Sequence, residues 1–323
     1  MTVATVAGPR TPLDFHHRCG RHVLGGGPIN ASRAFRPVAE YLGLDWRPKT
    51  LTFIGERDRT TIQDLLGPGG MDDFLFVPGT QTRNQISMRD GKEHTEYGAT
   101  TIEVSDDDIA ALVQQISQAE PGSWCGLTGS LPDGMSAQYF LDVISILQEL
   151  RVAVALDTRG HLLKALLEMG CYPDIIFPNK AELELLVADK LKALGLTEID
   201  PLDDNLLFDL TTGILPDGGI VVATLGPYGV FLRRRSHAWR INGKLPPGVD
   251  DVTRNGCGDA LFGGTLAGLN AAGLELSDEE VVWAVMLGVG AANAAMASVE
   301  PGGFPLELFR AVMQGHLVCD PVR

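Results

Sequence analysis

Four short apolar runs, separated by longer segments of helical pattern, constrain the fold of this chain more than any other feature. The apolar runs lie at residues 124–128, 152–156, 174–177 and 220–225. Segments with helical periodicity fall between or after them, at residues 137–150, 161–169, 181–194 and 259–270. Continuous apolar runs are typical of strands buried on both faces, and their alternation with helices is typical of βαβ units. The sequence therefore predicts an α/β fold with a mainly parallel, doubly wound sheet flanked by helices.

The segment at residues 81–103 has a different pattern, which predicts a β-hairpin. Two extended stretches, 82–88 and 93–102, flank the sequence Arg-Asp-Gly-Lys at residues 89–92. An Asp-Gly pair between two extended stretches is a strong hairpin signal. We expect this hairpin to lie outside the main sheet, as part of a flap.

Charge and cysteine usage exclude several classes of function. The formal net charge of the 323 residues is -15, which disfavours general binding to nucleic acid or to an anionic membrane. The 5 cysteines are widely spaced, with no Cys-x-x-Cys pair, so the sequence favours a reducing cytoplasm over a zinc site or a disulfide framework.

An uncharged stretch at residues 281–299 is long enough to cross a bilayer. It is rich in Ala and Gly, and it contains Asn293. It also follows Ser-Asp-Glu-Glu at residues 277–280, a capping-box pattern that begins helices of soluble proteins. We interpret it as a buried helix rather than a membrane span.

Polar motifs follow the four predicted strands directly. They are Gly-Ser-Leu-Pro at residues 129–132, Asp-Thr-Arg at 157–159, Pro-Asn-Lys-Ala-Glu at 178–182 and Gly-Pro-Tyr-Gly at 226–229. In open α/β sheets the ligand crevice lies outside the carboxyl ends of the strands. We therefore expect these motifs to line a single site.

The glycine-rich turn at residues 255–264 leads into a helix rich in small residues. Glycines allow a backbone to approach a phosphate closely, and amides at a helix N-terminus bind anions. Asp259 lies in the first turn, where its charge repels an anion. It either serves as a base for a hydroxyl that attacks a phosphoryl group, or it only stabilises the helix dipole. This segment alone leaves the two readings about equal.

Taken in order, these motifs resemble those of the ribokinase-like (PfkB) carbohydrate kinases. Gly-Cys-Gly-Asp at residues 256–259 is similar to the Gly-Ala-Gly-Asp signature of that family. The motifs at 129–132 and 178–183, together with Thr-Arg-Asn at 82–84 and Thr-Glu at 95–96, resemble the phosphofructokinase and tagatose-6-phosphate kinase branch. The resemblance extends from about residue 14 to about residue 298. It implies one kinase domain over residues 1–323, with a flap (lid) built from about residues 11–24 and 80–103.

The resemblance also implies an ATP-dependent phosphotransferase that acts on a hydroxyl of a sugar or sugar phosphate. Asp259 would be the general base, and the amides of Gly256, Cys257 and Gly258 would form an anion hole. Asn179 and Glu182 would organise Mg²⁺ and the ATP phosphates, partly through water. An Asn-x-x-Glu pattern is equally a helix N-cap with its partner three residues on, and both roles can hold together.

Further site residues come from the same resemblance. The acceptor would be bound by Asp14, Gly26, Asn30, Arg83 and Ser130. The nucleotide would be bound by Thr224, Gly226, Gly229 and Asn293, together with Asn179 and Glu182. For Asn293, an equally good interpretation is a buried amide that caps a neighbouring loop. Because flaps of this kind often associate, we expect a homodimer formed through the flap.

Departures from the family pattern lie mainly on the acceptor side. Residues 25–30 lack the lysine of the related Gly-Gly-Lys-Gly-x-Asn motif. Phe-Arg-Pro at 35–37 resembles an insertion that interrupts the following helix, and Arg254 is unusual just before the anion hole. These differences leave two alternatives open: a kinase of the same fold acting on a nucleoside or another small alcohol, or a non-catalytic sensor that binds a nucleotide or sugar.

Overall fold

The computed structural model describes residues 4–7, 12–16, 21–66, 74–90, 93–98, 102–132, 135–251, 254–298 and 300–322. For residues 4–7, 12–16, 21–24, 66, 83–90 and 93–98 it describes the backbone alone.

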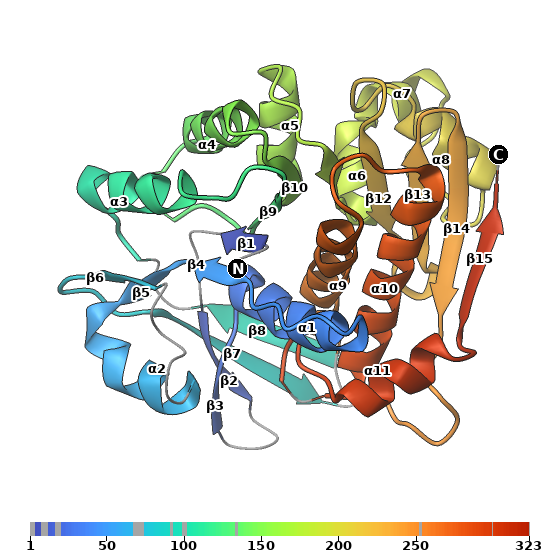
Figure 1. The fold of residues 1–323 in the computed structure, drawn as a ribbon. Coiled ribbons are helices and arrows are strands. Elements are labelled where there is room, and N and C mark those ends of the chain that lie inside the picture. The colour runs from blue at the N-terminus through green and yellow to red at the C-terminus, as the bar shows by residue number, and fades with distance from the viewer. Residues whose placement is uncertain are drawn as a thin grey trace.

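The centre of the molecule is a nine-stranded sheet in the order β15-β14-β13-β12-β11-β10-β9-β1-β4 (Figure 1). Strands β12, β11, β10, β9, β1 and β4 are parallel, whereas β13, β14 and β15 are antiparallel to their neighbours. The bounds are β1 (Ala4–Ala7), β4 (Lys49–Leu51), β9 (Trp124–Thr128), β10 (Ala153–Asp157), β11 (Ile175–Ile176), β12 (Ile220–Thr224), β13 (Val230–Arg234), β14 (His237–Gly243) and β15 (Leu317–Pro321).

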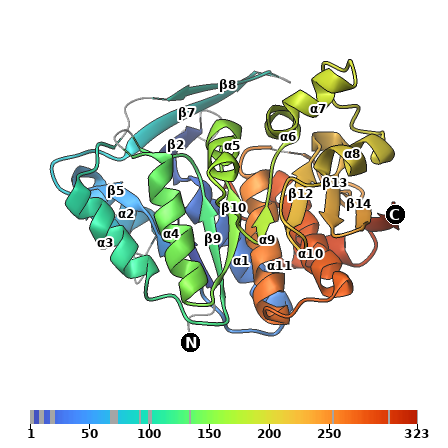
Figure 2. The ribbon, with the colours of Figure 1, turned by 90° about the horizontal axis from the view of Figure 1, so that it is seen from above.

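A separate four-stranded sheet has the order β3-β2-β7-β8 and lies to one side of the main sheet (Figures 1 and 2). It consists of β2 (Pro12–His16), β3 (Arg21–Leu24), β7 (Arg83–Asp90) and β8 (Glu93–Gly98). Strands β7 and β8 pair antiparallel, so the predicted hairpin is present and lies outside the main sheet. A third, two-stranded sheet pairs β5 (Phe53–Gly55) with β6 (Leu75–Val77).

Helices cover both faces of the main sheet (Figure 2). One face packs against α1 (Gly27–Tyr41), α9 (Cys257–Ala272), α10 (Asp278–Met296) and α11 (Leu306–Met313). The other packs against α3 (Asp106–Ile116), α4 (Ala137–Glu149) and α5 (Gly160–Glu168). The remaining helices are α2 (Arg59–Leu66), α6 (Lys180–Leu186), α7 (Ala188–Ala193), α8 (Asp204–Thr211), and the short 3₁₀ turns η1 (Glu56–Asp58) and η2 (Gly226–Tyr228).

The alternation of side chains along each strand explains why the predicted strands are continuous apolar runs. On β10, Ala155 belongs to the core on the α9 side, whereas Val154 and Leu156 belong to the core on the α4 side. Successive side chains of a strand point to opposite faces, so a strand covered on both faces needs apolar residues throughout. This arrangement confirms the predicted fold class.

The long uncharged stretch forms α10, which begins with the predicted capping box. Ser277 accepts a hydrogen bond from the Glu280 amide at 3.2 Å, and the Glu280 carboxylate accepts one from the Ser277 amide at 2.7 Å. The helix is buried against α9 and α11. In the part of the chain that the structure describes, no helix is long and apolar enough to cross a membrane.

Two local predictions were wrong. The predicted helix at 181–194 is divided into α6 and α7 at Val187, whose buried side chain joins the core around α8 and β12. Helix α1 is not interrupted at residues 35–37 but continues through Pro37. A proline inside a helix costs about 3 kcal/mol, and the buried face of α1 against α9 offsets this cost.

Candidate active site

Hydrogen bonds between neighbouring strand ends hold the polar motifs side by side. The Gly129 amide donates to the Asp157 carbonyl at 3.0 Å, and the Thr158 hydroxyl donates to the Gly129 carbonyl at 2.8 Å. The Thr224 amide donates to the Pro178 carbonyl at 2.9 Å, which brings the motif at 178–182 against the end of β12. The motifs therefore meet at the carboxyl edge of the parallel strands, as the sequence predicts.

The N-terminus of α9 is shaped by Gly256. This residue has a φ of 75°, and a Cβ atom added to it would lie 2.7 Å from the Gly302 amide nitrogen. Both observations require glycine here. The first-turn amides of an α-helix have no partner within the helix. Those of Cys257 and Gly258 follow Gly256 directly, and Gly258 is exposed to solvent.

Asp259 lies one residue further into α9, and it is held by a residue of α1. The Asn30 side-chain amide donates to Oδ2 of Asp259 at 2.8 Å, over a sequence separation of 229 residues. Burial raises the pKa of the Asp259 carboxyl, and the hydrogen bond from Asn30 partly opposes this effect. Oδ1 of Asn30 is buried and has no hydrogen-bond partner among the described residues. The pair thus presents a proton acceptor and an unused amide oxygen at the same place.

Asp157 was not assigned a role by the sequence, yet it is part of this cluster. Burial raises the pKa of the Asp157 carboxyl well above its ordinary value, and the charges of Asp259 and Glu182 raise it further. The Asp157 carboxyl is therefore close enough to feel the charges of two other carboxylates. The sequence feature that could have identified Asp157 is its position, because it directly follows a predicted strand and begins one of the polar motifs.

Asn179 and Glu182 form a capping box at the start of α6. The Asn179 side chain accepts from the Glu182 amide at 3.0 Å, and the Glu182 carboxylate accepts from the Asn179 amide at 3.0 Å. Burial raises the pKa of Glu182, while amide hydrogen bonds from Asn179 and Gly160 lower it. The capping role is therefore real, and it fixes the Glu182 carboxylate near Asp157.

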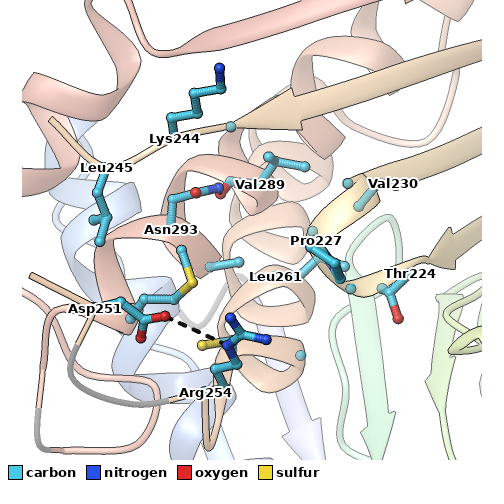
Figure 3. Close-up of a pocket in the computed structure, with 17 residues that line it drawn as sticks. Thr224, Pro227, Val230, Lys244, Leu245, Asp251, Arg254, Leu261, Val289 and Asn293 are labelled. Carbon is cyan, nitrogen blue, oxygen red and sulfur yellow. Dashed lines mark hydrogen bonds and ion pairs between the residues drawn. The ribbon is translucent and has the colours of Figure 1, made fainter. Parts of the chain in front are cut away.

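A pocket of about 490 Å³ lies between η2, the end of β14, α9 and α10 (Figure 3). Its lining brings together these predicted site residues: Thr224, Gly226, Gly229, Cys257, Gly258 and Asn293. The amide of Asn293 donates to the Val289 carbonyl of its own helix at 2.8 Å, rather than to a neighbouring loop. The pocket is predominantly apolar apart from its rim, where Lys244, Asp251 and Arg254 contribute charge.

For the remaining residues predicted to bind the acceptor, the structure describes fewer contacts. Gly26 has a φ of 100° and caps α1. Ser130 follows β9 and is half-buried. Asp14 lies on β2 and Arg83 on β7, two strands that pair in parallel, but their side chains fall outside the part of the chain that the structure describes.

A model of the pfkB family of carbohydrate kinases matches residues 9–304. The chain belongs to the PfkB family. It is accordingly an ATP-dependent sugar kinase.

Solved structures share the fold of this PfkB kinase over nearly its whole length. A putative phosphofructokinase from Staphylococcus aureus has 19% identity and a TM-score of 0.74, with 99% of each chain covered. Phosphofructokinase-2 from Escherichia coli, solved with substrates and products, has 20% identity and a TM-score of 0.75, covering 97% of this chain and 98% of that one. A possible 1-phosphofructokinase from Thermotoga maritima has 18% identity and a TM-score of 0.72, covering 99% and 100%.

Proposed function

We propose that this kinase transfers the γ-phosphoryl group of ATP to a hydroxyl of a sugar or sugar phosphate, with Asp259 as the general base. The observation that carries this proposal is the position of the Asp259 carboxylate. It lies in the first turn of α9, where it would repel a bound anion, and Asn30 holds it in one orientation. Burial raises its pKa, which brings a carboxylate closer to the strength needed for proton removal near neutral pH.

The N-terminus of α9 supplies the complementary feature. In our proposal, the amides of Gly256, Cys257 and Gly258 stabilise the charge that develops on the transferred phosphoryl group. Asp259 takes the proton of the attacking hydroxyl, and Asn30 orients Asp259. Oδ1 of Asn30, which lacks a partner among the described residues, is available to accept a hydrogen bond from another hydroxyl of the acceptor.

The pocket beside α9 is proposed to bind the nucleotide through Thr224, Gly226, Gly229 and Asn293. Among the described residues, no group of three or more His, Cys, Asp or Glu side chains is placed to hold a metal ion directly, so the proposed Mg²⁺ would keep water molecules and nucleotide phosphate oxygens among its ligands. Asn179 and Glu182 would hold Mg²⁺ partly through water, with Asp157 beside them. Bound Mg²⁺ would neutralise charge on the nucleotide phosphates.

For the acceptor, we propose that Asp14, Gly26, Asn30, Arg83 and Ser130 form the binding surface. The neighbouring Escherichia coli enzyme was solved with fructose-6-phosphate, which makes sugar phosphates of this kind the first candidates. We further propose that the β3-β2-β7-β8 sheet acts as a lid over the acceptor and excludes water, and that two copies associate through it into a homodimer.

The direct test is ADP release from Mg-ATP with a panel of acceptors, which includes fructose 1-phosphate, fructose 6-phosphate, tagatose 6-phosphate, free hexoses, ribose and nucleosides. We expect one acceptor to give turnover, and Asp259→Asn to reduce kcat by roughly 100- to 10,000-fold, the typical contribution of a general base.

The exposed aspartate Asp250 provides a matched control, and Asp250→Asn should retain full activity. Turnover of Asp259→Asn within a few fold of the unmodified protein would eliminate Asp259 as the base. Binding of ATP without turnover of any acceptor would favour the non-catalytic sensor instead.

A further inference from the structure

Arg254 lies at the rim of the pocket, immediately before the glycine turn that begins α9, and the proposed reaction gives it no role. Its Nε atom is 3.6 Å from Oδ2 of Asp251, and the two side chains are 73% and 36% exposed. An exposed ion pair of this kind contributes at most about 1 kcal/mol. Arg254 can therefore exchange Asp251 for a better anionic partner at little cost.

The pocket lining includes two chemically different sets of groups. Apolar side chains from β13, α10 and the segment after β14 line one part, namely Val230, Leu245, Val289, Ala292 and Met296. The other part is formed by Cys257 and Gly258 in the first turn of α9, which suits an anion. If a nucleotide occupies this pocket, as proposed above, its base would pack against the apolar side chains and its phosphates would lie at the N-terminus of α9.

Among the described residues that line the pocket, the cations are Lys244 and Arg254. Figure 3 shows the Lys244 side chain extending away from the other labelled residues, whereas the Arg254 guanidinium points toward Asp251 and Leu261, into the space beside α9. Burial raises the pKa of the neighbouring Cys257 thiol to about 12, and the charge of Arg254 partly opposes this rise. Arg254 thus exerts its field at the first turn of α9.

We propose that Arg254 is a nucleotide-specificity residue, which leaves Asp251 when a nucleotide binds and donates charge-assisted hydrogen bonds to its phosphates. The inference rests on the proposed function, since it needs a nucleotide in this pocket. The guanidinium fork suits phosphate oxygens, and Asp251 holds it at the rim before binding. Arg254 then distinguishes a nucleoside triphosphate from the bare nucleoside, and Asp251 competes with the nucleotide for the guanidinium.

The test is isothermal titration calorimetry of the full chain with ATP, ADP and adenosine, each with and without Mg²⁺. Arg254→Gln should weaken ATP binding by about 10- to 100-fold, the loss expected for a hydrogen bond to a charged group. It should change adenosine binding by less than about twofold, because adenosine carries no phosphate. Arg254→Lys should recover part of the ATP affinity, since the charge remains without the fork.

Asp251→Asn and Arg310→Gln complete the experiment. Asp251→Asn removes the competing carboxylate, so ATP should bind more tightly than to the unmodified protein. Arg310 is an exposed residue of α11 outside the pocket, and Arg310→Gln controls for the loss of one positive charge. Its ATP affinity should match that of the unmodified protein.

The outcomes separate this inference from the proposed function. If the unmodified protein binds ATP but Arg254→Gln binds it equally well, the role of Arg254 is wrong and the kinase proposal stands. Equal losses for ATP and adenosine would mean that Arg254 only maintains the shape of the pocket, which also overturns the inference. If the unmodified protein binds neither adenosine nor ATP, the proposed function itself fails.

Discussion

At the scale of single residues, the Asp157 carboxyl lies within reach of the charges of two other carboxylates, Glu182 and Asp259. Asp157, Glu182 and Asp259 come from β10, α6 and α9, and the pKa of each is raised, first of all by burial. Charged groups held this way reduce the stability of the folded chain. Proteins commonly accept such a cost at sites where the charges serve binding or catalysis.

Asp157→Asn is expected to stabilise the protein at neutral pH by on the order of 1–3 kcal/mol, the cost of an uncompensated buried polar group. In the unmodified protein, the pKa of the Asp157 carboxyl is raised in the folded state. The protonated carboxyl therefore contributes stability at low pH, and this contribution is lost as pH rises through the folded-state pKa. The amide, which never ionises, avoids the loss.

The gain in free energy of unfolding from Asp157→Asn should therefore be present at neutral pH. It should vanish as the pH falls toward the ordinary pKa of an aspartate carboxyl. Urea unfolding in the absence of Mg²⁺, followed at several pH values, measures it. Asp250→Asn, at an exposed position, should give no gain at any pH. A destabilised Asp157→Asn variant at neutral pH would show that Asp157 makes favourable contacts that outweigh its charge.

At the scale of elements, the close packing of α1 against α9 sets the geometry of the site. A Cβ atom added to Gly263 of α9 would lie 2.0 Å from the Ala31 carbonyl oxygen of α1. Ala31 directly follows Asn30, whose side chain holds Asp259. The glycine therefore allows the two helices to approach closely enough for the Asn30–Asp259 hydrogen bond to form.

Gly263→Ala should destabilise the protein by about 1–3 kcal/mol, as overpacking of a well-packed core does. The variant should also lose kcat under conditions where it remains folded, because a shift of α1 displaces Asn30 from Asp259. Urea unfolding and steady-state kinetics on the same preparation measure both effects.

Gly315 provides the matched control for this substitution. A Cβ atom there would have nothing within 4 Å, so Gly315→Ala should be neutral. If Gly263→Ala has the stability and kcat of the Gly315→Ala control, the helices can separate without consequence, and close packing does not position Asn30.

At the scale of the whole molecule, the small sheet has two edges, β3 and β8, that pair with no other described strand. Open edges of this kind tend to pair with another chain. The proposed nucleotide pocket is lined by η2, β14, α9 and α10, and none of its described lining residues belongs to the small sheet.

Sedimentation velocity at micromolar concentration should accordingly give twice the mass of the chain. Dilution into the range where the dimer dissociates should weaken acceptor binding more than nucleotide binding, since we place only the acceptor beneath the small sheet. A monomer at all micromolar concentrations would reject the proposed homodimer.

The sequence by itself determined the four central parallel strands β9 to β12 and several of the helices between and after them, because continuous apolar runs and helical periodicity are local patterns. It also indicated that the polar motifs share one sheet edge, since carboxyl ends of parallel strands meet there. Five strands of the main sheet, β1, β4, β13, β14 and β15, were not predicted, and the break at Val187 and the continuity of α1 through Pro37 were missed. Each of these depends on packing against elements distant in the chain.

Only the tertiary structure decided which side chains meet. Asn30 and Asp259 are 229 residues apart in sequence, and no local pattern shows that one donates to the other. The same holds for Asp157, whose raised pKa arises from burial and from charges on two other elements. The pairing of Arg254 with Asp251 at the rim of the pocket likewise depends on three-dimensional placement. Local sequence specifies what each segment can form, whereas burial and through-space charge arise only once the segments have packed together.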